Sequence, residues 1–110
     1  DYVTRQYDLA RAFASMLKRA DDFELAIDPD CNIVCFRYAP KGVSDLDALN
    51  TAIRKRLVRS GLFYIVQARL PKGWHLRVTL LNPLTTEAHL SNLLDTIRAT
   101  AMECQNTLVN

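Results

Sequence analysis

Arg77 is the residue whose type and position most suggest chemistry in this 110-residue chain. It lies within residues 74–83, where apolar and polar residues alternate with a period of two. That period is typical of a β-strand that buries one face. A guanidinium in such a strand is costly to bury unless an anion meets it. The pattern therefore places Arg77 either on a solvated face or opposite a carboxylate or phosphate from outside the chain.

The cysteines and histidines do not form a recognisable reactive set. Cys31, Cys35 and Cys104 are odd in number and lack the dense spacing of a secreted scaffold, which favours reduced thiols and a cytoplasmic setting. His75 and His89 show no ligand spacing relative to them, so we predict neither a metal site nor a cysteine hydrolase. We interpret Cys35 as a small core residue of a strand and assign no chemistry to His75.

Length and composition fit one soluble domain, residues 1–110. The chain is 49% hydrophobic and 24% charged, as in ordinary globular proteins. We predict no membrane partner, because no apolar run approaches the roughly 20 residues that span a bilayer. The net charge of +2 is too small to indicate a nucleic-acid partner. The chain begins at Asp1 without a methionine, so we expect it to be a fragment of a longer protein.

Hydrophobic periodicity predicts the order αββαββα. Helices are expected over residues 3–20 and 44–60 and after residue 85 or 86, and strands over 23–27, 32–39, 62–70 and 74–81. Ser44 and one of Thr85 and Thr86 are the expected N-caps, with Gly61 as the stop of the second helix. The predicted buried helical positions are Leu46, Leu49, Ile53, Leu57, Leu90, Leu93, Leu94, Ile97 and Ala101.

The connections predict an α+β sandwich. Residues 71–73 form a three-residue turn, which implies an antiparallel hairpin, and the middle helix requires a crossover. A four-stranded antiparallel sheet in the order 1-2-4-3, with three helices on one face, satisfies both conditions. Leu76 and Val78 then face the helices, and His75, Arg77 and Thr79 face away. An open face that carries aliphatic side chains suggests a covering partner.

Three short motifs give the chain a resemblance to a known family. They are Cys-Phe-Arg-Tyr at 35–38, Leu-Arg at 76–77, and Asn-Pro at 82–83 before Thr-Thr and an amphipathic helix. With them, essentially the whole chain resembles the C-terminal small domain of the group II pyridoxal-phosphate (PLP)-dependent amino-acid decarboxylases. Within that family, the sequence most resembles the L-2,4-diaminobutyrate decarboxylase branch, with glutamate and aromatic amino-acid decarboxylases as alternatives.

The resemblance implies a carboxy-lyase that works as a homodimer on an amino-acid substrate. PLP, the electron sink for decarboxylation, would be bound by a large domain absent from this chain. The family's Schiff-base lysine follows a histidine, and no lysine here does, so we expect no catalytic residue and no activity in this chain alone. Arg77 matches a small-domain arginine that in some members pairs with a substrate carboxylate. A structural ion pair across the domain interface is its alternative role.

Other basic residues have structural interpretations. We interpret Arg37 as a structural residue that is either ion-paired or extended to solvent, and Arg54, Lys55, Arg56 and Arg59 as a solvated helix face. The rival interpretation is an RNA-binding sheet, which stacks bases on exposed aromatics in a Lys/Arg-Gly-Phe-type motif. Residues 32–39 lack that motif. A non-enzymatic ferredoxin-like module for ligand binding, RNA binding or dimerisation remains the alternative, although it does not explain the Leu-Arg and Asn-Pro pairs.

Overall fold

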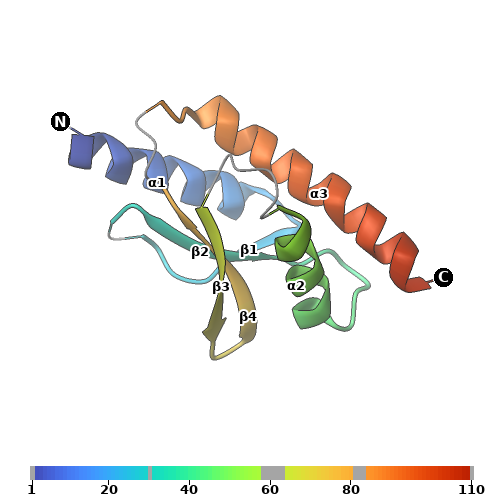
Figure 1. The fold of residues 1–110 in the computed structure, drawn as a ribbon. Helices are drawn as coiled ribbons and strands as arrows, with labels where there is room; N and C mark the ends of the chain where they lie inside the picture. The colour runs from blue at the N-terminus through green and yellow to red at the C-terminus, as the bar shows by residue number, and fades with distance from the viewer. Residues whose placement is uncertain (1, 30, 58–63, 81–83, 110) are drawn as a thin grey trace.

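The computed structural model describes residues 2–29, 31–57, 64–80 and 84–109 (Figure 1). The elements are α1 (Tyr2–Arg19), β1 (Phe23–Leu25), β2 (Ile33–Tyr38), α2 (Leu46–Leu57), β3 (Tyr64–Leu70), β4 (Gly73–Thr79) and α3 (Glu87–Val109). The strands form one sheet in the order β1-β2-β4-β3, and every neighbouring pair is antiparallel. The predicted αββαββα order, sheet order and α+β class are confirmed.

The three helices pack on one face of the sheet. Figure 1 shows α1 and α3 side by side, with α2 beside the C-terminal half of α3. The strand residues that point toward the helices are buried: Val34, Phe36 and Tyr38 in β2, and Leu76 and Val78 in β4. The predicted orientation of Leu76 and Val78 is therefore confirmed.

Phe36 lies at the centre of this core. Its side chain is fully buried, and the ring of Phe13 from α1 meets it edge-on, with the ring centroids 5.4 Å apart. Phe23 of β1 packs on it from the other side at 6.0 Å. Burying a side chain of this size stabilises the fold by about 1.5–3 kcal/mol, so these contacts hold α1 firmly on the sheet.

The predicted apolar stripes of α2 and α3 are in the core, with one partial exception. Leu46 is half-buried. The fully buried members are Leu49, Ile53, Leu57, Leu90, Leu93, Leu94, Ile97 and Ala101. The three-and-four spacing was sufficient to identify these faces because each helix covers the sheet or another helix with a single stripe.

The helix caps differ in one place from the prediction. Asp45, not Ser44, caps α2, because its Oδ1 accepts a hydrogen bond from the Ala48 amide at 3.0 Å. Both residue types are good caps. The structure selects Asp45 because its side chain reaches Ala48, the third residue of α2. Thr86 caps α3: its Oγ1 accepts from the His89 amide at 3.3 Å, and its own amide donates to His89 Nδ1 at 3.0 Å.

The predicted element boundaries are close to those observed. β1 ends at Leu25 and β4 at Thr79, each two residues earlier than expected. Gly61 and the Asn82–Pro83 pair lie outside the described residues. Within the described ranges, no helix is long and apolar enough to cross a membrane.

The β3–β4 hairpin is fastened to α2 at its turn. Gly73 has a φ of +129°, in the region that favours glycine. The next residue, Trp74, donates its amide hydrogen to Oδ1 of Asp47 in α2 at 2.9 Å. This contact fixes the start of β4, the strand that carries Arg77.

Candidate functional site

The helix-free side of the sheet holds the candidate site, and we call it the open face. Its side chains alternate along each strand with those of the core. Its described members are Glu24 of β1, Ile33, Cys35 and Arg37 of β2, Val66 and Ala68 of β3, and His75, Arg77 and Thr79 of β4. The sequence prediction that His75, Arg77 and Thr79 point away from the helices is consistent with this register.

Arg77 occupies the middle of the open face. β4 is flanked on both sides, and Arg77 lies opposite Cys35 of β2 and Val66 of β3. Its side chain is exposed. Among the described residues it makes no hydrogen bond or ion pair, although its charge acts on Cys35. A rigid central strand thus presents an available two-pronged donor, which suits a carboxylate.

Arg37, the other arginine of this face, is already paired. It lies opposite Glu24 in the β1–β2 register. Its Nε and Nη2 donate to Glu24 Oε2 at 3.1 and 3.0 Å, and its Nη1 donates to the Lys72 carbonyl at 3.3 Å. The prediction of a structural role for Arg37 is confirmed, in its ion-paired form. Arg77 is therefore the guanidinium of this face that is open to an external anion.

Cys35 corrects a sequence-based interpretation. It is half-buried on the open face and is not a core residue, because Val34 and Phe36 take the core positions on either side of it. Burial raises the pKa of the Cys35 thiol, and the positive charge of Arg77 opposes that rise in part. The thiol therefore stays protonated at neutral pH and is a poor nucleophile.

His75 is buried although it lies on the open face. Only 2% of its surface is exposed, and its Nδ1 lies 2.9 Å from the Gly73 carbonyl oxygen. A carbonyl oxygen only accepts hydrogen bonds, so this contact requires a proton on Nδ1. Strand alternation could not indicate this burial, because it places His75 on the same face as the exposed Arg77.

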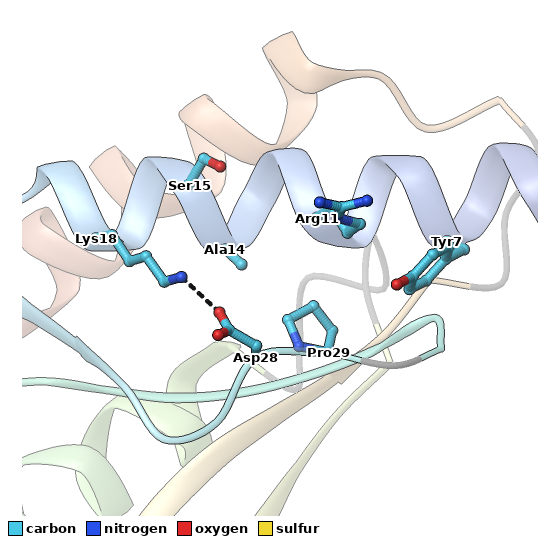
Figure 2. Close-up of a pocket in the computed structure, with 7 residues that line it drawn as sticks. All are labelled: Tyr7, Arg11, Ala14, Ser15, Lys18, Asp28 and Pro29. Carbon is cyan, nitrogen blue, oxygen red and sulfur yellow. Dashed lines mark ion pairs between the residues drawn. The ribbon is translucent and has the colours of Figure 1, made fainter.

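A second group of polar residues lies between α1 and the segment that follows β1. A pocket of about 370 Å³ between α1 and residues 28–29 is lined by Tyr7, Arg11, Ser15, Lys18 and Asp28, residue types that can hold a phosphate and an imine (Figure 2). Lys18, however, forms an ion pair with Asp28, and their side chains are 56% and 74% exposed. A Schiff-base lysine needs a desolvated, uncharged amine. Because the Lys18 amine is charged and solvated, this pocket does not fit PLP.

The basic cluster of α2 does not form one cationic surface. Arg56 pairs with Glu103 of α3 at 2.8 Å, and Arg54 is half-buried with its Nε out of solvent. Lys55 is exposed as predicted, and Arg59 lies outside the described residues. The aromatic rings of Phe36 and Tyr38 face the core, so they are not available to stack on bases as an RNA-binding sheet requires. In the described part of the chain, no three His, Cys, Asp or Glu residues group as metal ligands.

Comparison with known sequences relates the chain to one class of enzyme. No protein-family profile matches it. It is 29% identical over 115 residues to an aspartate 1-decarboxylase of Aliivibrio fischeri, and 32% identical over 95 residues to an L-2,4-diaminobutyrate decarboxylase of Rhizobium meliloti. The relatives of this chain are PLP-dependent amino-acid decarboxylases. The two matches cover 84% and 86% of the chain.

Solved structures of decarboxylases share the fold. The glutamate decarboxylase domain of a Vibrio parahaemolyticus protein, named as a diaminobutyrate–pyruvate transaminase and L-2,4-diaminobutyrate decarboxylase, aligns with 90% of the chain at 30% identity and a TM-score of 0.79. Oryza sativa TDC, solved with PLP and tryptamine, aligns with 94% at 22% identity and the same score of 0.79. The second likeness concerns the fold alone.

The chain matches only a part of each decarboxylase. It spans 21% and 19% of the two sequence relatives, and 22% and 23% of the two solved chains. The names of these proteins include aspartate and diaminobutyrate as substrates. The comparisons thus support the expected class of enzyme, and they do not distinguish between amino-acid substrates.

Proposed function

We propose that this chain is the C-terminal small domain of a cytoplasmic, homodimeric PLP-dependent amino-acid decarboxylase. The observation that carries the proposal is the combination of similarity to decarboxylases over 84–90% of the chain with an exposed Arg77 at the centre of the open face, where it makes no hydrogen bond or ion pair with the described residues. PLP would be held by the part of the enzyme outside this chain, where it would serve as the electron sink for loss of carbon dioxide. The chain alone would be inactive.

Arg77 would bind a substrate carboxylate. A bidentate guanidinium fixes the plane of a carboxylate as well as its position, and orientation of the scissile group is a large part of catalysis in such enzymes. The central strand holds the Arg77 backbone between β2 and β3, so the side chain starts from a fixed point. The neighbouring Arg37 is neutralised by Glu24 and does not compete for the same anion.

The substrate we propose is L-2,4-diaminobutyrate, which would give 1,3-diaminopropane and carbon dioxide. This choice rests on the 32% identity to the Rhizobium meliloti enzyme of that name and on the 30% identity to the Vibrio parahaemolyticus domain. The second candidate is decarboxylation of an acidic or aromatic amino acid, favoured by the match to aspartate 1-decarboxylase and by a 29% identity to an aromatic-L-amino-acid decarboxylase.

The visible absorption spectrum of the purified full-length protein tests the proposal. We expect a PLP band that changes when L-2,4-diaminobutyrate is added, with release of carbon dioxide. A band that responds to aspartate, glutamate or an aromatic amino acid instead would keep the enzyme class and replace the substrate. A colourless protein that cannot be reconstituted with PLP would refute the proposal and favour a ferredoxin-like binding module.

A further inference from the structure

Two arginines on adjacent strands of the open face are in opposite states. The Arg37 side chain is 12% exposed, and its guanidinium donates to both carboxylate oxygens of Glu24. The Arg77 side chain is exposed and makes no hydrogen bond or ion pair with the described residues. Because the two residues share a side-chain type and a sheet face, the difference between them comes from their neighbours.

The cross-strand neighbours account for this difference. Side chains directly opposite each other in an antiparallel sheet have Cβ atoms about 4.5–5.5 Å apart and interact as pairs. Arg37 has a carboxylate in that place, since it lies opposite Glu24. Arg77 lies opposite Cys35 of β2 and Val66 of β3. Valine has no charge, and the thiol of Cys35 stays neutral because burial raises its pKa.

The next residues of the open face do not supply an anion to Arg77 either. Ile33 and Thr79, the adjacent pair of β2 and β4, are uncharged. Glu24 is the only carboxylate among the described members of the face, and it belongs to β1, one strand further away. Both of its oxygens are bound by Arg37. The guanidinium of Arg77 therefore keeps its charge available to a group from outside the chain.

The size and burial of the two neighbours also favour binding of an external group. Cys35 and Val66 are half-buried, and both are much shorter than arginine, so the guanidinium of Arg77 extends beyond them. Thiol and methyl groups beside the arginine replace part of the water that would surround it on an open surface. A charge-assisted hydrogen bond is stronger where less water screens it.

We propose that Cys35 and Val66 are positioning residues for the substrate carboxylate, because they hold Arg77 between two short, uncharged side chains and so keep its guanidinium unpaired. The inference rests on the proposed function, in which Arg77 binds that carboxylate. Both residues act through Arg77. A carboxylate introduced at either position would occupy the guanidinium, as Glu24 occupies that of Arg37.

Val66→Glu in the full-length enzyme tests the inference, with Val66→Gln as its matched control. The two replacements have nearly the same size, and only the first places a carboxylate opposite Arg77. We expect kcat/KM of Val66→Glu to be at least about 10-fold below that of Val66→Gln, because the introduced carboxylate competes for a charge-assisted, two-pronged donor. The loss should lie mainly in KM, since this competition precedes the reaction.

Arg77→Gln shows whether the loss passes through the guanidinium. In the Arg77→Gln background, the ratio of kcat/KM between the two Val66 variants should shrink to less than about 3-fold, the effect of an exposed charge. Cys35→Asp and Cys35→Asn form a second matched pair on the other side of Arg77. This pair decides by the same criteria if Val66→Glu does not fold.

Urea unfolding gives a readout that needs neither PLP nor turnover. The urea midpoint of Val66→Glu, relative to that of Val66→Gln, should be higher when Arg77 is present than in the Arg77→Gln background, because the introduced carboxylate pairs with the arginine. A merely structural role of Val66 would give the same relative midpoint in both backgrounds.

The outcomes separate this inference from the proposed function. Equal kcat/KM in Val66→Glu and Val66→Gln, with Arg77→Gln impaired, would overturn the inference and leave the proposed function intact. An equal loss with and without Arg77 would overturn it as well. If Arg77→Gln keeps the wild-type kcat/KM, the substrate role of Arg77 fails and the positioning role fails with it. If the spectral test refutes the decarboxylase, the urea comparison decides: absence of coupling between positions 66 and 77 overturns the inference, whereas coupling would show that the neutral neighbours keep Arg77 unpaired.

Discussion

The side chain of Asn50 in α2 binds both backbone polar groups of Tyr38, the last residue of β2. Its Oδ1 accepts the Tyr38 amide hydrogen at 2.8 Å, and its Nδ2 donates to the Tyr38 carbonyl at 2.9 Å. β4 pairs with β2 only as far as Phe36, so the amide of Asn50 takes the place of the missing strand neighbour. Asn50 is 1% exposed, and the bond pair ties α2 to the sheet.

Replacement of Asn50 by leucine should destabilise the domain strongly. Leucine has nearly the same size but leaves the amide and carbonyl of Tyr38 buried without partners, which costs about 2–4 kcal/mol. Urea unfolding of the wild type and Asn50→Leu measures the difference. Asn92→Leu, at an exposed position of α3, should change the unfolding free energy by less than about 0.5 kcal/mol. Equal effects of the two variants would contradict the role of Asn50.

A methyl group at Gly73 should be more harmful than one at Gly42. Both glycines have positive φ, +129° and +88°, so either alanine variant costs about 1 kcal/mol in backbone strain. At Gly73 a Cβ would also lie 2.3 Å from Asp47 Oδ1, whereas at Gly42 nothing lies within 4 Å. Gly73→Ala must therefore displace the carboxylate that binds the Trp74 amide, at a cost of about 1–3 kcal/mol more. Thermal or urea unfolding of the two variants measures the difference. If both variants lose the same unfolding free energy, the contact between Asp47 and the Trp74 amide does not stabilise the hairpin.

The sequence was sufficient for the fold because its signals agree with one another. The Leu90–Leu94–Ile97 spacing of α3, the alternation around Val78 and the turn after residue 70 each have one physical solution. Together they leave the 1-2-4-3 antiparallel sheet as the arrangement that buries every stripe. The turn is one residue shorter than predicted, because Gly73 already pairs with Leu70 as the first residue of β4. The side on which Arg77 lies followed directly from the parity of the strand, since a residue one step from Val78 must point to the other face.

What the sequence could not provide were contacts between distant polar residues. Asn50 is one residue from Leu49 on the buried stripe, and nothing local indicates that it reaches β2. Gln6 is also buried, and its Nε2 donates to the Leu80 carbonyl at 2.8 Å across the fold. Cys35 was wrongly predicted as a core residue, and the burial of His75 was not predicted. Both side chains lie beside the segment 24–27 and the β3–β4 turn, which strand alternation does not describe. Such positions depend on tertiary contacts and leave no periodic signal.

The Asp22–Arg98 ion pair should make stability depend on acid pH. Arg98 donates from Nε and Nη2 to the Asp22 carboxylate at 2.7 and 3.1 Å, and these hydrogen bonds lower the pKa of Asp22 despite a counteracting effect of burial. A depressed native pKa means that the stabilisation is complete above the ordinary value of 3.8 and is lost as the pH falls through the native value.

Unfolding free energies of the wild type and Asp22→Asn at several pH values measure this contribution. At about pH 6 we expect the variant to be less stable by about 1 kcal/mol, because the pair is partly screened by solvent. The difference should shrink as the pH falls from 3.8 through the lowered native pKa of Asp22. Asp95→Asn removes a carboxylate that is 70% exposed and also bound to Arg98, and should have a smaller effect. A difference that stays constant with pH would mean that Asp22 acts through packing and not through its charge.

Arg77→Lys in the full-length enzyme should impair catalysis without affecting folding. Lysine keeps the charge but loses the two parallel donors, so kcat/KM should fall about 10- to 100-fold, the loss expected for a charge-assisted hydrogen bond. Stability should be unchanged, because Arg77 is exposed and makes no hydrogen bond or ion pair with the described residues. Steady-state kinetics and urea unfolding of the same preparation give both quantities.

Arg37→Lys is the matched control, because it makes the same substitution on the adjacent strand of the same face. Its bidentate ion pair with Glu24 is partly shielded from solvent, since the Arg37 side chain is 12% exposed and that of Glu24 40%. We therefore expect Arg37→Lys to lose about 1 kcal/mol of stability and to leave kcat/KM unchanged. The two variants thus separate binding from structure. If Arg77→Lys instead lowers stability and leaves kcat/KM intact, Arg77 holds the domain interface and the substrate carboxylate is bound elsewhere. If it changes neither quantity, both roles are refuted.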